Sequence, residues 1–318
     1  MNDRLKFRFD SYQRRFKQPL RTSHGIWQIR EGIIISLVDQ FGVVRQGEIA
    51  PLPWFGSETM SQALEFCQQL PKTISLKDVA AIPDCLPCCQ FAFESAVLIS
   101  STQQNNRPNN LNYCYLLPAG EQALTSWQNI YQNQAATTFK WKIGVLPLAR
   151  EIEILKQLTS ILPPGVKLRL DANGGLNLQQ ARKLLSLTDK LKEIAFVEQP
   201  LPPDDFADIW QLRQEHTTLL ALDESIASFR QLQIAHQQGW EGVYVIKAAI
   251  MGFPSGVKQF CQENCLDIVF SSVFETKVGR GAVLKMAQEL NHPRAVGFGI
   301  QHFYDDRYLC NRRKERKL

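Results

Sequence analysis

Four runs of sequence decide the fold of this chain: VKLRLD (166–171), IAFVE (194–198), LLALD (219–223) and VYVIK (243–247). Each run is aliphatic and ends in a charged residue, and the charged residues follow one another at intervals of 27, 25 and 24 positions: Asp171, Glu198, Asp223 and Lys247. Such runs are typical of buried strands in a parallel sheet. A buried charge is costly unless it has a partner, so one charge at the end of each strand indicates a site.

The same alternation of strand and helix continues on both sides of these runs. Further strands are predicted at 112–117, 138–143, 267–272 and, more weakly, 295–299, and helices at 121–134, 148–160, 177–189, 204–215, 228–238, 255–264 and 278–290. Repeats of one strand and one helix build either a doubly wound sheet or a closed barrel. Seven or eight repeats favour the barrel, whose catalytic groups lie at the carboxyl ends of the strands. No G-x-G-x-x-G follows the early strands, which argues against a dinucleotide fold.

The first 110 residues have a different pattern. Residues 3–50 alternate as β-strands do, with a hairpin turn predicted at 39–42 and a polar loop predicted at 18–27. Ser57 is the predicted N-cap of a helix, and a second helix is predicted from Pro87 to about residue 100. The polar segment QQNNRPNN then predicts a boundary between an α+β domain, 1–110, and the barrel, 111–299.

Charge and composition exclude several classes of protein. The net charge of +5 resides in residues 307–318, which hold six basic residues and one Glu, because the other residues hold 30 basic and 30 acidic side chains. A nucleic-acid-binding surface is therefore not indicated, and we interpret the tail as a solvated or docked terminus. No apolar run approaches the ~18 residues of a membrane span. The charged start, MNDRLKFRFD, is unlike a secretory signal. A chain with eight cysteines and no secretory signal is predicted to lie in the cytoplasm. Its thiols are then expected to be reduced, and neither a disulfide framework nor a zinc site is predicted.

The three strand-end acids predict a metal site. In a barrel the side chains of Asp171, Glu198 and Asp223 converge, and like charges at close range repel one another. A hard divalent cation removes this conflict, and ligands that are all oxygen favour Mg²⁺, with Mn²⁺ as a substitute, over Zn²⁺. Asn173 lies two residues after Asp171, on the same face, and we expect it to hold that carboxylate in place.

Lysines complete the predicted site. Lys140 and Lys142 share one face of the strand FKWKI, and Lys247 comes four strands later, which places it across the mouth of an eight-unit barrel. Two bases on either side of a metal suit proton removal next to a carboxylate, with the metal stabilising the enediolate that develops. Taken singly, Asp171 and Asp223 fit helix caps and Lys142 fits an exposed rim residue. The regular spacing of all of them favours the site.

At this point several motifs resemble the enolase superfamily, in its muconate-lactonizing branch. The motifs are KWK (140–142), DAN (171–173), VEQP (197–200), LDES (222–225) and VIK (245–247). Three further segments look like the o-succinylbenzoate synthase family: PLRTSHG (19–25), GEIAPLPWFGSET (47–59) and SSVFET (271–276). The resemblance covers nearly the whole chain. It implies a modified TIM barrel, (β/α)7β, with an α+β capping domain that the C-terminal tail, about 300–318, completes.

The resemblance also implies roles for the site residues. Asp171, Glu198 and Asp223 would be Mg²⁺ ligands, in the superfamily's chemistry of a lysine base and a metal-stabilised enediolate. Lys142 would be the base in a syn dehydration of SHCHC, 2-succinyl-6-hydroxy-2,4-cyclohexadiene-1-carboxylate, in menaquinone or phylloquinone biosynthesis. Lys247 would stabilise the enediolate as an ammonium, and Lys140 would keep Lys142 deprotonated.

Expectations for substrate binding rest on the same resemblance. Loops around His24 and around Trp54 and Phe55 would close over the substrate. Ser271 and Ser272 would bind its succinyl carboxylate. Glu275 would be a loop salt bridge or part of the pocket wall, and not a metal ligand. The partner expected is a small molecule, with a monomer and a dimer both compatible with the sequence.

Other functions fit parts of the same pattern. Racemases of N-acylamino acids and epimerases of dipeptides would use the same two lysines, one on each face of the α-carbon. A Schiff-base aldolase would use Lys247 as a nucleophile on this barrel, although three converging acids argue against it. A non-catalytic barrel that binds through its basic tail is the remaining alternative, and the intact set of acids and lysines argues against it.

Overall fold

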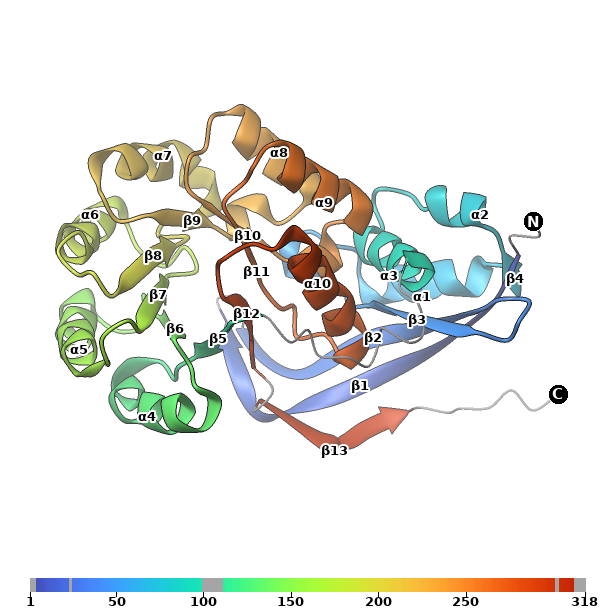
Figure 1. Ribbon diagram of the computed structural model, residues 1–318, viewed down its shortest axis with the longest axis horizontal. Helices are drawn as coiled ribbons and strands as arrows, with labels where there is room; N and C mark the ends of the chain where they lie inside the picture. Colours follow the sequence, from blue (N-terminus) through green and yellow to red (C-terminus); the bar gives the residue numbers. More distant parts are fainter. Residues whose placement is uncertain (1–3, 23–24, 99–110, 301–302, 312–318) are drawn as a thin grey trace.

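The computed structural model describes residues 4–22, 25–98, 111–300 and 303–311, and it contains a parallel barrel and an antiparallel capping sheet (Figure 1). Among the described residues, eight strands form the parallel sheet in the order β11-β10-β9-β8-β7-β6-β5-β12. Their bounds are β5 Tyr113–Leu116, β6 Thr138–Lys142, β7 Lys167–Asp171, β8 Ile194–Glu198, β9 Leu220–Leu222, β10 Val243–Ile246, β11 Ile268–Phe270 and β12 Val296–Gly299. A parallel bridge between Ser271 and Gly297 connects the β11 edge to the β12 edge.

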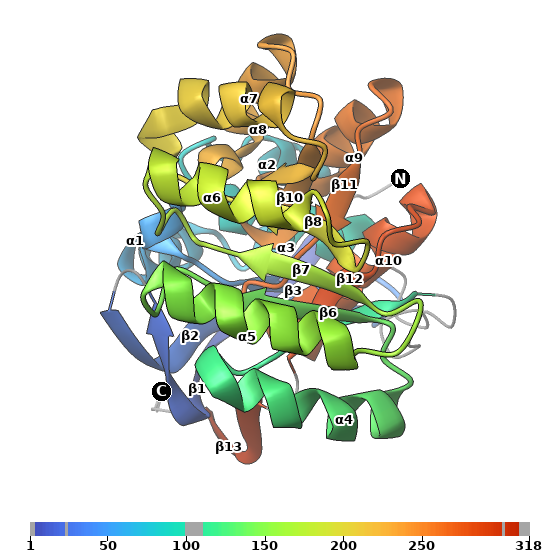
Figure 2. The same cartoon turned by 90° about the vertical axis from the view of Figure 1, so that its left-hand side faces the viewer.

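Each strand from β5 to β11 is followed by a helix on the outside of the sheet, as Figure 2 shows for α4, α5 and α6. The helices are α4 Ala123–Gln134, α5 Leu148–Ile161, α6 Leu178–Thr188, α7 Phe206–Glu215, α8 Phe229–Gln237, α9 Pro254–Glu263 and α10 Lys277–Leu290. Short 3-10 helices precede four of them: η2 Gly120–Gln122, η3 Pro203–Asp205, η4 Glu224–Ile226 and η5 Ala248–Ile250. The predicted strands and helices of this half are all present. None of the described helices is both long and apolar enough to span a lipid bilayer.

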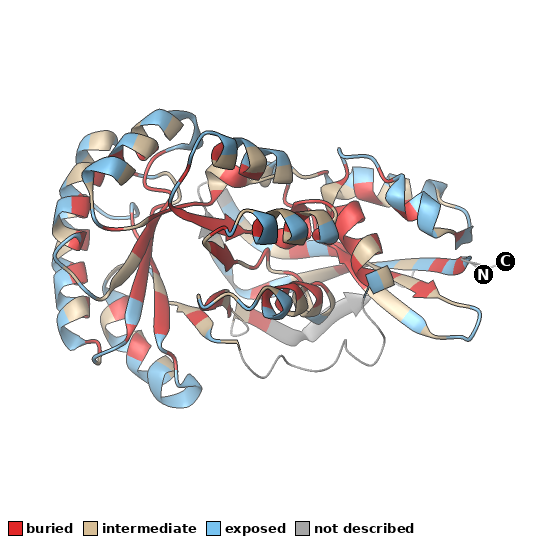
Figure 3. Cartoon of the chain, turned by 45° about the horizontal axis from the view of Figure 1, so that its top comes forward, coloured by how far each residue is buried: buried red, intermediate tan, exposed pale blue. Residues whose placement is uncertain are grey.

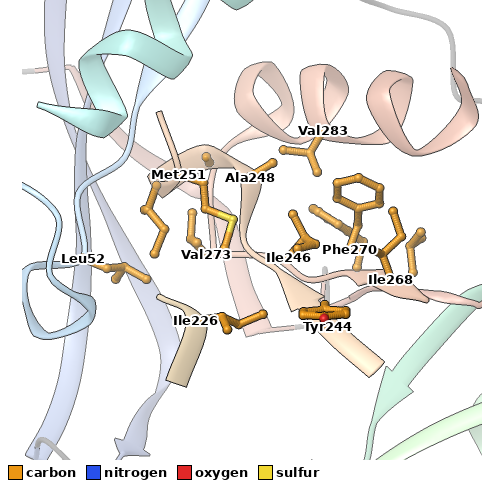
Figure 4. Close-up of a cluster of buried hydrophobic side chains, with 14 of the residues drawn as sticks. Leu52, Ile226, Tyr244, Ile246, Ala248, Met251, Ile268, Phe270, Val273 and Val283 are labelled. Carbon is orange, nitrogen blue, oxygen red and sulfur yellow. The ribbon is translucent and has the colours of Figure 1, made fainter. Parts of the chain in front are cut away.

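The two faces of the barrel strands pack in different cores. Side chains of one parity pack against the outer helices, as Ile246 and Phe270 do near Val283 of α10 (Figure 4). Side chains of the other parity form a separate small cluster that contains Phe196, Ala221, Val243, Val245 and Val269. Figure 3 shows the barrel strands buried and the outer faces of the helices exposed.

The small inner cluster explains where the polar groups of the barrel lie. In a strand, residues two positions apart point to the same side. Phe196, Ala221, Val245 and Val269 each precede a polar or charged residue by two positions. These polar or charged residues are Glu198, Asp223, Lys247 and Ser271. They lie at the carboxyl ends of their strands, directly above the apolar cluster.

The capping sheet has the strand order β13-β1-β2-β3, with β4 paired to β1. Its strands are β1 Leu5–Thr22, β2 Gly25–Val38, β3 Val44–Ile49, β4 Thr73–Ile74 and β13 Tyr304–Asn311, and its helices are η1 Pro53–Phe55, α1 Met60–Gln69, α2 Leu76–Ala80 and α3 Pro87–Leu98. Helix α3 packs closely on β3 at Gly47. A Cβ atom at this position would lie only 1.9 Å from the carbonyl oxygen of Ala92. The modified TIM barrel with an α+β cap is thus confirmed, and β13 brings the end of the chain back onto β1. The predicted domain boundary at residue 110 lies outside the described residues.

Two local predictions in the cap are wrong. The segment 18–27 was expected to be a loop, but β1 and β2 continue through most of it, pairing Leu20 with Trp27 after a register shift beyond Arg15. The N-cap of α1 is Thr59 and not Ser57, because Thr59 and Gln62 form a reciprocal capping box. The Ser57 hydroxyl instead accepts a hydrogen bond from the Leu52 backbone N–H at 2.7 Å. The hairpin turn at 39–42 is present, with Gly42 at φ 80°.

Candidate active site

A cavity of about 330 Å³ opens at the carboxyl ends of the barrel strands and extends beneath the cap. Its walls contain eleven of the twelve residues predicted for the site: Lys140, Lys142, Asp171, Asn173, Glu198, Asp223, Lys247, Ser271, Ser272, Trp54 and Phe55. The twelfth, His24, lies outside the described residues. The first nine come from the barrel and the last two from η1 of the cap, so both halves of the chain form the cavity.

Lys140 connects two of the predicted acids. Its Nζ atom lies 2.8 Å from Asp171 Oδ2 and 2.7 Å from Glu198 Oε1, both of which are buried. Burial lowers the pKa of the Lys140 ammonium, but the two carboxylates outweigh burial and hold that pKa above its usual range. Burial raises the pKa of Asp171, but Lys140 and Lys142 outweigh it and hold the pKa of that carboxyl below its usual range. The Asp171 carboxylate therefore stays ionised beside the Lys140 ammonium.

Lys142 belongs to a chain of hydrogen bonds that crosses three strand ends. Its Nζ atom donates to Asn173 Oδ1 at 2.9 Å, and Asn173 Nδ2 donates to Glu224 Oε1 at 3.0 Å. The backbone N–H of Asn173 donates to Asp171 Oδ1 at 3.1 Å, and Asn173 itself has a positive φ of 43°. Asn173 thus contacts Asp171 through its backbone N–H, in a left-handed and not an extended conformation, while its side-chain oxygen accepts from Lys142 Nζ.

Lys247 lies across the mouth, beside Asp223. Its Nζ atom pairs with Asp223 Oδ1 and lies 4.1 Å from the centre of the Phe55 ring. A cation over an aromatic face is stabilised by the ring quadrupole, so the cap contributes directly to the surroundings of this lysine. Burial is the largest influence on Lys247 and lowers the pKa of its ammonium to about 7.

The two serines in the loop after β11, Ser271 and Ser272, make different contacts. Ser271 lines the cavity and bridges to Gly297. The Ser272 hydroxyl donates to Glu275 Oε2 at 2.7 Å and accepts from the Phe274 backbone N–H at 2.9 Å. Glu275 is buried and accepts a second hydrogen bond from the Val273 backbone N–H at 2.7 Å. Glu275 is thus a buried acceptor within its own loop, and the hydroxyl proton of Ser272 is directed at it.

Known proteins resemble this chain along most of its length. Residues 122–306 match the family described as enolase C-terminal domain-like. The chain is 38% identical over 304 residues to an o-succinylbenzoate synthase of Thermosynechococcus vestitus, covering 94% of each protein. The chain belongs to the o-succinylbenzoate synthase family of the enolase superfamily.

Solved structures agree with this assignment. A crystal structure of o-succinylbenzoate synthase from Thermosynechococcus elongatus BP-1, complexed with Mg in the active site, superimposes with a TM-score of 0.89 at 38% identity and covers 95% of each chain. The L-Ala-D/L-Glu epimerase of Bacillus subtilis superimposes with a TM-score of 0.80 at 20% identity, covering 95% of this chain and 91% of the other, which shows a shared fold.

Two charged residues of this family member were missed in the sequence. Arg169 is buried in the cavity wall, where Nη2 donates to the Ala295 carbonyl at 2.7 Å and the guanidinium lies over Phe196. It precedes Asp171 by two positions, so the period of two could have revealed it. Glu224 also lines the cavity; burial, with the Asp171 charge adding to it, raises the pKa of Glu224 to about 7. Its place beside Asp223 in the LDES motif was the available signal.

The donor atoms at the site fit a hard cation. Three buried carboxylates face the same mouth, and the Nζ atoms of Lys140 and Lys247 pair with them. The Lys140 ammonium lies between the Asp171 and Glu198 carboxylates, which shows that a positive charge is favourable at this position. Within the described ranges, no group of three or more His, Cys, Asp or Glu side chains is already arranged to hold a metal ion. The metal ligands of this family member therefore remain a prediction.

Proposed function

We propose that this protein dehydrates SHCHC to o-succinylbenzoate in a Mg²⁺-dependent reaction. The observation that carries the proposal is the 38% identity to an o-succinylbenzoate synthase across 94% of both chains. It is supported by lysines on opposite sides of the cavity and by acids on the strands between them. The product would serve menaquinone or phylloquinone biosynthesis.

Asp171, Glu198 and Asp223 would hold the metal, and Mn²⁺ could take the place of Mg²⁺. When bound, Mg²⁺ supplies a Lewis acid that offsets the negative charge developing on the substrate carboxylate. Oxygen donors alone suit this ion. Lys140 then acts through its charge: a second ammonium close to Lys142 favours the neutral amine there.

Lys142 carries the proton transfers. Its neutral amine takes the proton from the carbon next to the substrate carboxylate, and the electron pair of that C–H bond enters the enediolate. The same ammonium then gives its proton to the departing hydroxyl on the same face, so the C–O bond breaks and water leaves. The ring becomes aromatic, and Lys142 returns to its neutral state. Asn173, 2.9 Å from Lys142 Nζ, orients the amine for both transfers.

Lys247 would act without moving a proton. Its ammonium faces the cavity from the side opposite Lys142 and stabilises the enediolate electrostatically. In its buried position, the protonated Lys247 would act more strongly on the developing negative charge than an exposed ammonium, because water screens it less. The Phe55 ring and Asp223 hold the ammonium in place.

Incubating the purified protein with SHCHC tests the proposal. With Mg²⁺ the diene absorbance should disappear and o-succinylbenzoate should form; EDTA should stop the reaction, and added Mg²⁺ should restore it. Racemisation is the competing function, because one lysine on each side of an α-carbon suits proton exchange. Solvent deuterium incorporated into an N-acylamino acid or dipeptide, with no loss of SHCHC, would establish that function instead.

A further inference from the structure

The loop 271–276 forms one wall of the cavity in a strained conformation. Ser271, Ser272, Val273 and Phe274 all line the cavity. Phe274 has φ 62°, in the left-handed region that side chains with a Cβ atom rarely adopt. Such a conformation costs on the order of 1–3 kcal/mol and persists only where the surroundings impose it. Something outside the loop must therefore hold it.

Glu48 of the capping strand β3 holds the far end of this loop. The Thr276 backbone N–H donates to Glu48 Oε1 at 2.8 Å and to Oε2 at 3.0 Å, and the Thr276 hydroxyl also donates to Oε2. The Gly279 backbone N–H donates to Oε2 at 2.9 Å, and the Tyr12 hydroxyl donates to Oε1 at 2.5 Å. The carboxylate is buried, so these charge-assisted bonds are strong.

A glycine in the first turn of α10 allows the Glu48 carboxylate to approach the helix closely. A Cβ atom at Gly279 would lie 3.1 Å from Glu48 Oε2, so the glycine leaves room for the carboxylate. Glu48 thus accepts from the free N–H groups at the start of α10, where a negative charge is favourable. Since α10 begins at Lys277, fixing its start fixes Thr276, the last residue of the loop.

The cap also holds Phe274 itself. The hydroxyl of Tyr304, on β13, donates to the Phe274 carbonyl at 2.7 Å. The Phe274 ring packs edge-on against Phe16 of β1 and Trp27 of β2, with centroid distances of 5.3 Å and 5.4 Å. The strained residue is therefore fixed by the capping sheet on its backbone and on its ring.

A second junction between cap and barrel offers a matched contrast. Glu94 of α3 accepts from the backbone N–H and the hydroxyl of Ser255, at 2.9 Å and 2.7 Å, at the start of α9. This is also a cap carboxylate at the start of a barrel helix, but Ser255 and the residues immediately before it do not line the cavity. Glu48 and Glu94 thus make similar junctions, and only Glu48 fixes a segment that forms the cavity wall.

We infer that Glu48 is a positioning residue for substrate recognition: through Thr276 it makes the capping sheet impose the shape of the cavity wall at 271–274. The inference rests on the proposed function, because the effect of the cavity wall is measured as the KM for SHCHC. Loss of the Glu48 charge releases the start of α10 and with it the Thr276 end of the loop, so the cavity wall at 271–274 is held from one end less firmly. Substrate binding weakens, while the lysines and acids at the other strand ends keep their places.

The test compares Glu48→Gln with Glu94→Gln. Glu48→Gln should raise KM for SHCHC about tenfold, as expected for losing hydrogen bonds to a charged group, and change kcat by less than about threefold. The Kd of the product o-succinylbenzoate, measured by calorimetry, should rise by a similar factor. Glu94→Gln should leave KM and Kd within about twofold of wild type, although both substitutions lower the melting temperature.

Thr276 supplies a second pair of variants should Glu48→Gln fail to fold. Thr276→Ser keeps the hydroxyl donor and should retain the wild-type KM, whereas Thr276→Val loses it and should raise KM. An active wild-type enzyme whose KM is raised equally, or not at all, by Glu48→Gln and Glu94→Gln would overturn the positioning role and leave the proposed function standing. A wild-type protein that does not consume SHCHC would overturn the proposed function, and this inference with it.

Discussion

Replacing Glu275 by glutamine should remove a pH dependence from the stability of this fold. Glu275 is buried, and its Oε2 atom accepts two hydrogen bonds, whereas Oε1 has no hydrogen-bond partner among the described residues. Burial raises the pKa of Glu275 from 4.5 to about 7. The folded state therefore binds this proton more tightly than the unfolded state, and the protonated carboxyl favours folding.

The sign and size follow from that pKa difference. The stabilising contribution of the Glu275 proton is complete below about pH 4.5 and is lost as the pH rises through about 7. At about 1.4 kcal/mol per pH unit, the interval from 4.5 to about 7 corresponds to about 3 kcal/mol. Glutamine is neutral at every pH, and its carbonyl oxygen can accept the same two hydrogen bonds from Ser272 and Val273.

Urea unfolding at pH 5 and pH 8.5, at constant ionic strength, measures the effect. Between these pH values the free energy of unfolding of the wild type should fall by about 2–3 kcal/mol more than that of Glu275→Gln. The variant should accordingly gain stability relative to the wild type at the higher pH, and the measurement at the lower pH serves as the internal control. Equal changes in both proteins, within about 0.5 kcal/mol, would refute the reasoning.

Three further predictions test other parts of the structure. Gly47→Ala should cost about 3 kcal/mol or more in urea unfolding, because the new Cβ would meet the Ala92 carbonyl; a cost below about 0.5 kcal/mol would contradict the close packing. Cys85 and Cys265 should react with a thiol reagent in the folded protein, whereas the buried cysteines react only after unfolding; slow labelling of these two would contradict their exposure. Lys247→Ala should lower kcat by ~10²–10³ with SHCHC, as removal of one electrostatic stabiliser does in other enzymes, and a kcat within threefold of wild type would exclude its role.

Much of the barrel could be predicted because its sequence signals are local. Each strand is a short aliphatic run, and the period of two alone assigns side chains to the inner or the outer face. Lys140 and Lys142 therefore share a side. The regular spacing of the strand-end charges then brings them to one mouth, because parallel barrel strands all end at the same face.

The cap was less predictable because its interactions are distant in sequence. Pairing of Leu20 with Trp27 continues β1 and β2 through a segment whose polar composition predicts a loop. The contact between Glu48 and Thr276 joins residues 228 positions apart, and no periodicity of the sequence predicts it. The role of Ser272 was obscured for the same reason, because its hydroxyl proton is directed at a buried carboxyl that the sequence alone does not show to be buried.

One substitution tests the central claim, that Lys142 is the base of a dehydration at this site. Purified wild type and Lys142→Ala are each mixed with SHCHC and Mg²⁺, and the diene absorbance is followed while circular dichroism verifies that both are folded. The account predicts rapid loss of the diene with o-succinylbenzoate as the product in the wild type, and no turnover in the folded variant. Appreciable dehydration by Lys142→Ala, or a wild type that leaves SHCHC unchanged, would contradict it.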